Sequence, residues 1–88
     1  MNIKRGHDMS VAEARTRVER IAAELQDRFG LESSWEENVL LVWGQNVDGL
    51  IILRDREVEI SVDLGPPLII MAGPIRTAIE ATMEKNLG

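Results

Sequence analysis

The sequence contains no cysteine and no tyrosine, has a single histidine and lacks a glycine-rich phosphate loop. Without cysteine, neither a disulfide framework nor a thiolate metal site can form, which favours a reducing compartment. His7 beside Asp8 leaves one arrangement for acid-base chemistry, a base with an orienting carboxylate. The simpler interpretation makes His7 a loop residue that bonds near a helix start. We therefore expect no enzyme, no catalytic residue, no cofactor and no metal.

Long apolar runs and basic clusters are missing as well. Residues 1–8 hold no apolar segment of signal-peptide length, and no later stretch reaches the ~18 apolar residues that span a bilayer. The net charge is −5, and residues 31–65 contain two basic against eight acidic residues. Nucleic acid requires clustered Lys and Arg to displace phosphate counterions. We expect a cytoplasmic protein without a transmembrane segment and without a nucleic-acid partner.

One helix is clearly indicated near the start of the chain. Ser10 and Glu13 have the spacing of a capping box, in which the serine hydroxyl accepts from the Glu13 amide. Gly30 suits the left-handed conformation that ends many helices, with Leu31 folding back toward Leu25. Between these signals, apolar residues recur at helical spacing: Val11, Ala14, Val18, Ile21, Ala22, Leu25 and Phe29. The pattern predicts a helix over residues 11–29.

A four-stranded antiparallel meander is predicted after this helix. Short polar turns near Glu36-Glu37, Gln45-Asn46 and Asp55-Arg56 separate strands at 31–35, 38–44, 47–54 and 57–64. Asn46 can take the left-handed conformation that a tight hairpin requires. Residues 2–5 can add a fifth strand at one edge.

The C-terminal segment is predicted to form a second helix, opened by Pro66-Pro67. Gly73-Pro74 interrupts its pattern, since Pro74 removes a hydrogen bond to the Ile70 carbonyl, and a kink or restart is expected there. The apolar stripe of this helix consists of Leu68, Met71, Ala72, Ile75, Ile79, Met83 and Leu87. The predicted fold is a single α+β domain, residues 1–88, with both helices on one sheet face.

Strand register assigns an apolar surface to the other sheet face. Residues 57–64 alternate apolar and polar side chains, and opposite residues of an antiparallel pair share a face. Propagating this register pairs Leu40 with Ser33 and produces an apolar inner face. The outer face then has an apolar centre with an acidic margin. We call this centre the outer apolar patch; its members are Val39, Leu41, Trp43, Leu50 and Ile52.

The outer apolar patch is the predicted binding site, with Trp43 as its anchor. Two simpler interpretations remain: residues 1–9 cover the patch, or a β-bulge turns some members inward. Contiguous apolar surface of this kind is unusual on a soluble monomer, which favours an interface. Five side chains provide ~7–15 kcal/mol gross, against an association cost of ~4–15 kcal/mol. The patch therefore needs additional contacts around it.

Short motifs along nearly the whole chain resemble one family. They are His7 before the helix, Ala14-Arg15 within it, Phe29-Gly30 at its end, Trp35-Glu36, Val47-Asp48-Gly49, Leu64-Gly65, Ile79-Glu80 and Asn86-Leu87. In order and spacing the sequence resembles the polyhydroxyalkanoic acid system family, short bacterial proteins encoded near genes for polyester storage granules. Gly73-Pro74 and the strongly apolar middle strands depart from the usual pattern.

The resemblance implies a role in polyhydroxyalkanoate storage and carries over no catalytic residue. Combined with the patch, it predicts a non-enzymatic accessory or binding protein, cytoplasmic or at storage granules. Its partner is a second copy of the chain, another protein of this system or the polyester surface. The alternative is a small carrier of a hydrophobic acyl-type ligand with a helix-grip-like fold, whose ligand lies between the final helix and the inner sheet face.

Overall fold

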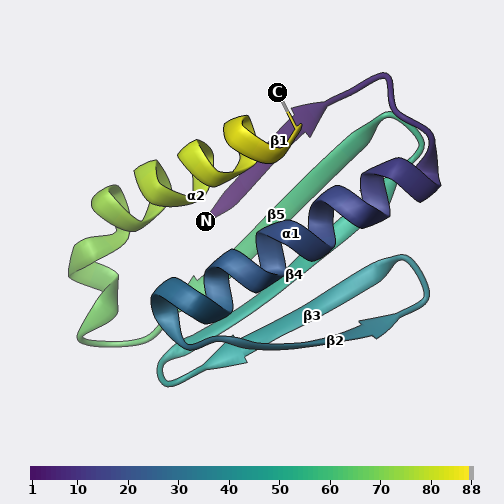
Figure 1. The fold of residues 1–88 in the computed structure, drawn as a ribbon. Helices are drawn as coiled ribbons and strands as arrows, with labels where there is room; N and C mark the ends of the chain where they lie inside the picture. Colours follow the sequence, from purple (N-terminus) through teal and green to yellow (C-terminus); the bar gives the residue numbers. More distant parts are fainter. Residues whose placement is uncertain (88) are drawn as a thin grey trace.

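Five antiparallel strands form one sheet, and two helices pack on one of its faces (Figure 1). The computed structural model describes residues 1–87. The strands are β1 (Asn2–Gly6), β2 (Glu32–Glu36), β3 (Val39–Gly44), β4 (Val47–Arg54) and β5 (Glu57–Leu64), in the order β1-β5-β4-β3-β2. The helices are α1 (Val11–Phe29) and α2 (Ala72–Leu87), the latter preceded by a 3₁₀ helix, η1 (Leu68–Met71). The predicted α+β class is confirmed, and the fifth edge strand is present.

The register of the central strands is the one predicted. Ile51 lies between Leu40 of β3 and Ile60 of β5 on the inner face. The first hairpin differs, because Leu40 pairs with Trp35 rather than with Ser33, and its turn lies at residues 37–38, one residue later than expected. A shift of two residues keeps each side chain on its face, since side chains alternate with a period of two. The assignment of inner and outer faces therefore survives the correction.

Helix α1 begins and ends where its sequence signals predict. The Glu13 amide donates to the Ser10 hydroxyl at 3.2 Å, and that hydroxyl lies 3.4 Å from the Glu13 carboxylate. Gly30 has a φ of 68°, and its amide donates to the Gln26 carbonyl at 2.8 Å. A side chain would strain this left-handed position, whereas glycine adopts it freely.

The C-terminal helix is broken near Gly73-Pro74, as predicted, but the break lies slightly earlier. Helix η1 ends at Met71 and α2 starts at Ala72, which places Pro74 in the first turn of α2. An amide in that turn has no partner within its helix, so proline fits without a kink.

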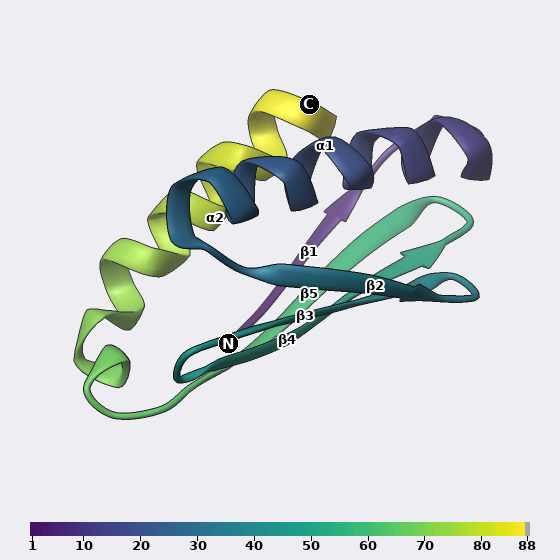
Figure 2. The same ribbon diagram turned by 60° about the horizontal axis from the view of Figure 1, so that its bottom comes forward.

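The hydrophobic core fills the space between the helices and the inner sheet face. Its members are buried apolar side chains from both layers: Ile3, Ala14, Val18, Ile21, Leu25, Leu40, Val42, Ile51, Leu53, Val58, Ile60, Val62, Ile79 and Met83. Both helices lie on this side, and the opposite sheet face has no helix over it (Figure 2). Among residues 1–87, no helix combines the length and apolar character needed to cross a membrane.

Candidate interaction surface

The outer apolar patch lies on the helix-free face of the sheet, as the register predicted. Strand pairing places Val39 opposite Ile52 and Leu41 opposite Leu50, so four members form two adjacent cross-strand rows on β3 and β4. Trp43 extends the patch along β3. Trp43 is 42% exposed and Leu50 37%, whereas the other three are half-buried. The structure therefore brings all five residues together and leaves Trp43 the most accessible.

Neither simpler interpretation of the patch holds for the described residues. The N-terminal segment forms β1 at the far edge of the sheet, beside β5, and does not cross β3 (Figure 1). The pairing of β3 with β4 runs without interruption from Val39–Ile52 to Gly44–Val47, so no bulge turns a patch residue inward.

One end of the patch is acidic. Trp43 lies between Glu32 of β2 and Asp48 of β4, and Asp48 is paired with Asp63 of β5. Like charges directly opposite each other destabilise a sheet, so this pair costs stability unless something neutralises it. The sequence predicts an acidic margin around the patch, and these three acids belong to it. The pairing of Asp48 with Asp63 follows from the register of β4 and β5, which the sequence predicted correctly.

The surface is hollowed beside Trp43. A depression of about 380 Å³ is lined by three patch residues, both carboxylates and three of their neighbours: Leu41, Trp43 and Leu50, Asp48 and Asp63, and Val42, Gly49 and Ser61. An apolar wall and two acids thus meet at one place. Such a depression suits a long side chain that is apolar along its stem and positively charged at its end.

The other end of the patch is closed by an ion pair. Glu59 of β5 points to the outer face, yet it is only 7% exposed, because it lies between Ile52 of β4 and Lys4 of β1. Its carboxylate accepts a hydrogen bond from Arg54. This bond, with a smaller contribution from Asn2, lowers the pKa of Glu59 below its ordinary value of 4.5. Glu59 stays ionised near neutral pH and is already neutralised from within the chain.

The other tryptophan, Trp35, has a different role. Trp35 is on the inner face, and the guanidinium of Arg15 lies over its ring, 3.9 Å from the centroid. The same Arg15 donates to the Glu37 carbonyl at 3.0 Å. Trp35 therefore holds the first hairpin against α1, while Trp43 faces outward.

His7 is a loop residue that bonds near the start of α1. Its Nδ1 accepts a hydrogen bond from the Met9 amide at 3.1 Å. With Nδ1 used as an acceptor, only Nε2 carries a proton to donate, and it has no partner among residues 1–87, so His7 does not bond Asp8 as a base-and-orienter pair requires. Nε2 of His7 is buried, and within residues 1–87 it has no hydrogen-bond partner.

No group of three acidic or histidine side chains in the described part of the chain is placed to hold a metal ion. Asp48 and Asp63 face each other, but Glu57 and Glu59 lie toward the other end of β5 and bond to Arg54.

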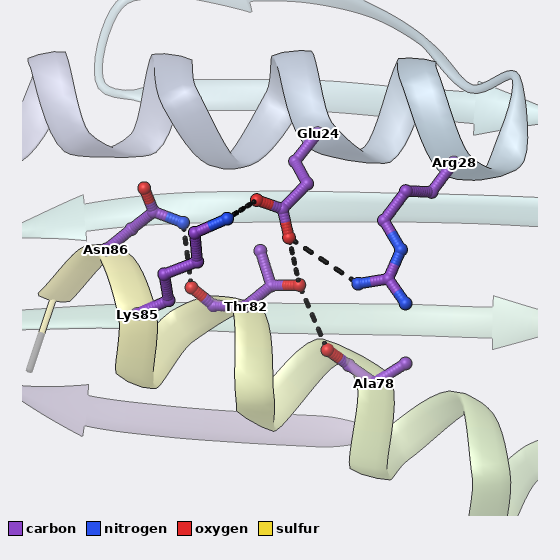
Figure 3. A network of polar contacts seen from close by, with 6 residues as sticks. All are labelled: Glu24, Arg28, Ala78, Thr82, Lys85 and Asn86. Atoms are coloured by element: carbon purple, nitrogen blue, oxygen red, sulfur yellow. Dashed lines mark hydrogen bonds and ion pairs between the residues drawn. The ribbon is translucent and has the colours of Figure 1, made fainter.

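Helix α2 is attached to α1 by a polar network at its C-terminal half (Figure 3). Glu24 of α1 receives a hydrogen bond from Thr82 at 2.9 Å and one from Lys85 at 3.1 Å. Arg28 lies 3.6 Å from the same carboxylate. The Lys85 bond, followed by the Thr82 bond, lowers the pKa of Glu24. These contacts attach the C-terminal half of α2 to α1.

These features define a two-layer α+β protein whose sheet has one face packed under helices and one face open. The family model described as "Putative polyhydroxyalkanoic acid system protein" (PHA_gran_rgn) matches residues 1–87, so the chain belongs to this family. The resemblance inferred from the sequence is confirmed. The description connects the family to the polyhydroxyalkanoic acid system and names no reaction. No curated protein and no solved structure matches the chain.

Proposed function

We propose that this protein is a non-enzymatic accessory protein of the polyhydroxyalkanoate system that binds another protein through the outer apolar patch. The observation that carries the proposal is the position of all five patch residues on a sheet face without a helix. Contiguous apolar surface of this kind marks interaction sites on soluble proteins. Membership of the family supports a role in the polyhydroxyalkanoic acid system, and the geometry of the sheet supports the outer apolar patch as the binding surface.

Charge favours a different protein over a second copy of this chain. Around the patch, the outer face carries acidic Glu32, Glu36, Asp48, Glu57, Glu59 and Asp63 and basic Lys4 and Arg54. The acids outnumber the bases, and the charged side chains nearest Trp43 are all acidic, although the N-terminal ammonium of Met1 bonds the Val62 carbonyl nearby. Two copies packed face to face would bring like charges together, which disfavours that complex. We assign the face to a partner with an apolar centre and basic residues around it.

The depression beside Trp43 indicates how such a partner binds. An Arg or Lys of the partner would lay its stem along Leu41 and Leu50 and its cation near Asp48 and Asp63. The indole of Trp43 adds a cation-π contact at the same place. Pairing the two carboxylates with a cation would remove their mutual repulsion, so binding and relief of repulsion act together.

The free edges of the sheet are less suited to this role. Edge strand β2 has five residues, and it carries Glu32 and Glu36 at its ends. Short charged edge strands resist pairing with another strand. The face offers the apolar area and the hollow that the edges lack.

Co-sedimentation with polyester granules tests the proposal. The purified protein is mixed with native granules, which retain their coat proteins, and with granules stripped of protein by protease and detergent. We expect binding to native granules, little binding to stripped granules, and weaker binding at high salt because a charged margin contributes. Equal binding to both would assign the patch to the polyester surface and overturn the protein partner.

Sedimentation velocity provides the second readout. The protein is expected to sediment as a monomer over the concentrations used for granule binding. A stable dimer that Trp43→Glu converts to monomer would assign the face to a second copy of the chain and contradict the proposal.

A further inference from the structure

An apolar cavity of about 510 Å³ lies on the inner side of the sheet, between the end of α1 and the start of the C-terminal helices. Its walls come from both layers: Leu25, Phe29, Gly30, Leu31, Val42, Gln45, Val47, Gly49, Leu50, Ile51, Ile60, Val62, Leu64, Leu68, Met71, Ile75 and Ile79. Pockets for small ligands commonly occupy about 300–1,000 Å³. The depression beside Trp43 lies on the other side of the sheet and shares Val42, Gly49 and Leu50 with the walls of the cavity.

Two features of the chain keep this space open. The buried residues of α2 begin only at Ile79, so its first turns and η1 do not pack tightly on the sheet. Below them, Gly49 occupies the inner-face row between Val42 and Val62. A glycine in that row leaves out the side chain that would fill the floor.

The lining shows what kind of ligand fits. Among the described lining residues, Gln45 has the only polar side chain, and no residue is charged. The other lining residues are apolar or glycine. Burying a charged group there would be costly, since it would find no counter-ion. A hydrocarbon chain would find apolar contacts along the whole cavity, with its polar end beside Gln45 or in solvent.

The mouth of the cavity has an apolar lip. Phe29 is 45% exposed and Met71 49% exposed, and both line the cavity. Beside Met71, Ile70 is 84% exposed. Large apolar side chains this exposed on a short 3₁₀ helix give an incoming chain a surface to contact before it enters.

We infer that this cavity binds a single unbranched hydrocarbon chain of an acyl or alkyl ligand, with the polar head group left at the mouth. The cavity shares Leu50 with the outer apolar patch but is lined mainly from the helix side of the sheet, so ligand binding here and protein binding at the patch are tested separately. The apolar cavity supports the acyl-ligand alternative drawn from the sequence, because it lies where that ligand was expected, beside Met71 and Ile75.

Straight-chain primary alcohols test the site directly. Methyl NMR spectra of the full chain are recorded during titration with hexanol, octanol and decanol. We expect the Ile75, Ile79 and Val62 methyl signals to shift, and each added methylene to tighten binding about fourfold until the cavity is full. Shifts confined to residues beside Trp43, or none, would overturn the inference.

A matched pair of variants locates the ligand. Val47→Phe fills the cavity, whereas Val39→Phe makes the same change at a half-buried position on the outer face. Val47→Phe is expected to weaken decanol binding at least tenfold and Val39→Phe to leave it unchanged. Equal affinities for the two variants would contradict the site. Trp43→Glu should retain full decanol binding, which separates this result from the fate of the proposed protein partner.

Discussion

At the level of single residues, the acids of the outer face differ in their charge partners. Glu59 is buried and paired with Arg54, whereas Asp48 and Asp63 face each other beside the exposed Trp43. A carboxylate satisfied within the chain stabilises the fold. A carboxylate opposed by another is available to a cation from outside.

The Glu59–Arg54 pair predicts a dependence of stability on pH. The pKa of Glu59 is lower in the folded state, so its contribution is complete above the unfolded value of about 4.5 and is lost as the pH falls below it. Glu59→Gln should therefore lower the free energy of unfolding at pH 7, and the difference from the wild type should shrink as the pH falls below about 4.5. Urea unfolding at several pH values measures this. A difference that is constant with pH would contradict the assignment, and Glu36→Gln on exposed β2 serves as control.

The N-terminal cap of α1 gives a second prediction. Ser10→Ala removes the acceptor of the Glu13 amide and should lower the free energy of unfolding by about 1 kcal/mol. Thermal or urea unfolding provides the measurement. An unchanged midpoint would mean that the cap contributes nothing to stability.

At the scale of elements, α2 is attached by its second half only. Ile79, Thr82, Met83 and Asn86 are buried, whereas η1 has no buried residue. The predicted apolar stripe from Leu68 to Leu87 is thus divided into a docked part and a part that borders the cavity. Periodicity identified the stripe correctly, but it carries no information about where a helix leaves the sheet.

A pair of truncations tests this division. Met83 is fully buried, and Met83→Ala should lower the free energy of unfolding by about 2–5 kcal/mol, the usual cost of such a cavity. Ile70→Ala at an exposed site should change it by less than about 0.5 kcal/mol. Urea denaturation distinguishes the two. Similar losses for both would contradict the view that η1 lies free of the core.

At the scale of the whole molecule, most of the architecture could be predicted from the sequence. The alternation of apolar and polar residues in 57–64 predicted which side chains face the core, and the cap signals predicted the ends of α1. Both signals are local in the sequence. The register of the first hairpin was wrong by two residues because its turn lies one residue later, at Glu37 and Asn38. Glu37 takes a left-handed φ of 54°, which is unusual for glutamate, and the turn preference of Asn38 was overlooked. The cavity was not predicted in its walls or volume, since it depends on how α2 approaches Gly49, a distance that no local pattern encodes.

The free energy of binding that the outer apolar patch can contribute is smaller than the estimate made from the sequence. Val39, Leu41 and Ile52 are already half-buried by their neighbours, so a partner gains less than the ~7–15 kcal/mol of five fully exposed side chains. The charged margin and the depression beside Trp43 must supply the remaining affinity and the specificity.

Binding of two variants to native granules tests whether the outer apolar patch binds a granule protein. Trp43→Glu places a charge in the outer apolar patch, and Ile70→Glu makes a similar change at the exposed apolar tip of η1. Co-sedimentation is measured for both beside the wild type, with circular dichroism to confirm equal helix content. We expect Trp43→Glu to lose granule binding and Ile70→Glu to retain it. Retention by Trp43→Glu, or loss by Ile70→Glu alone, would contradict this expectation.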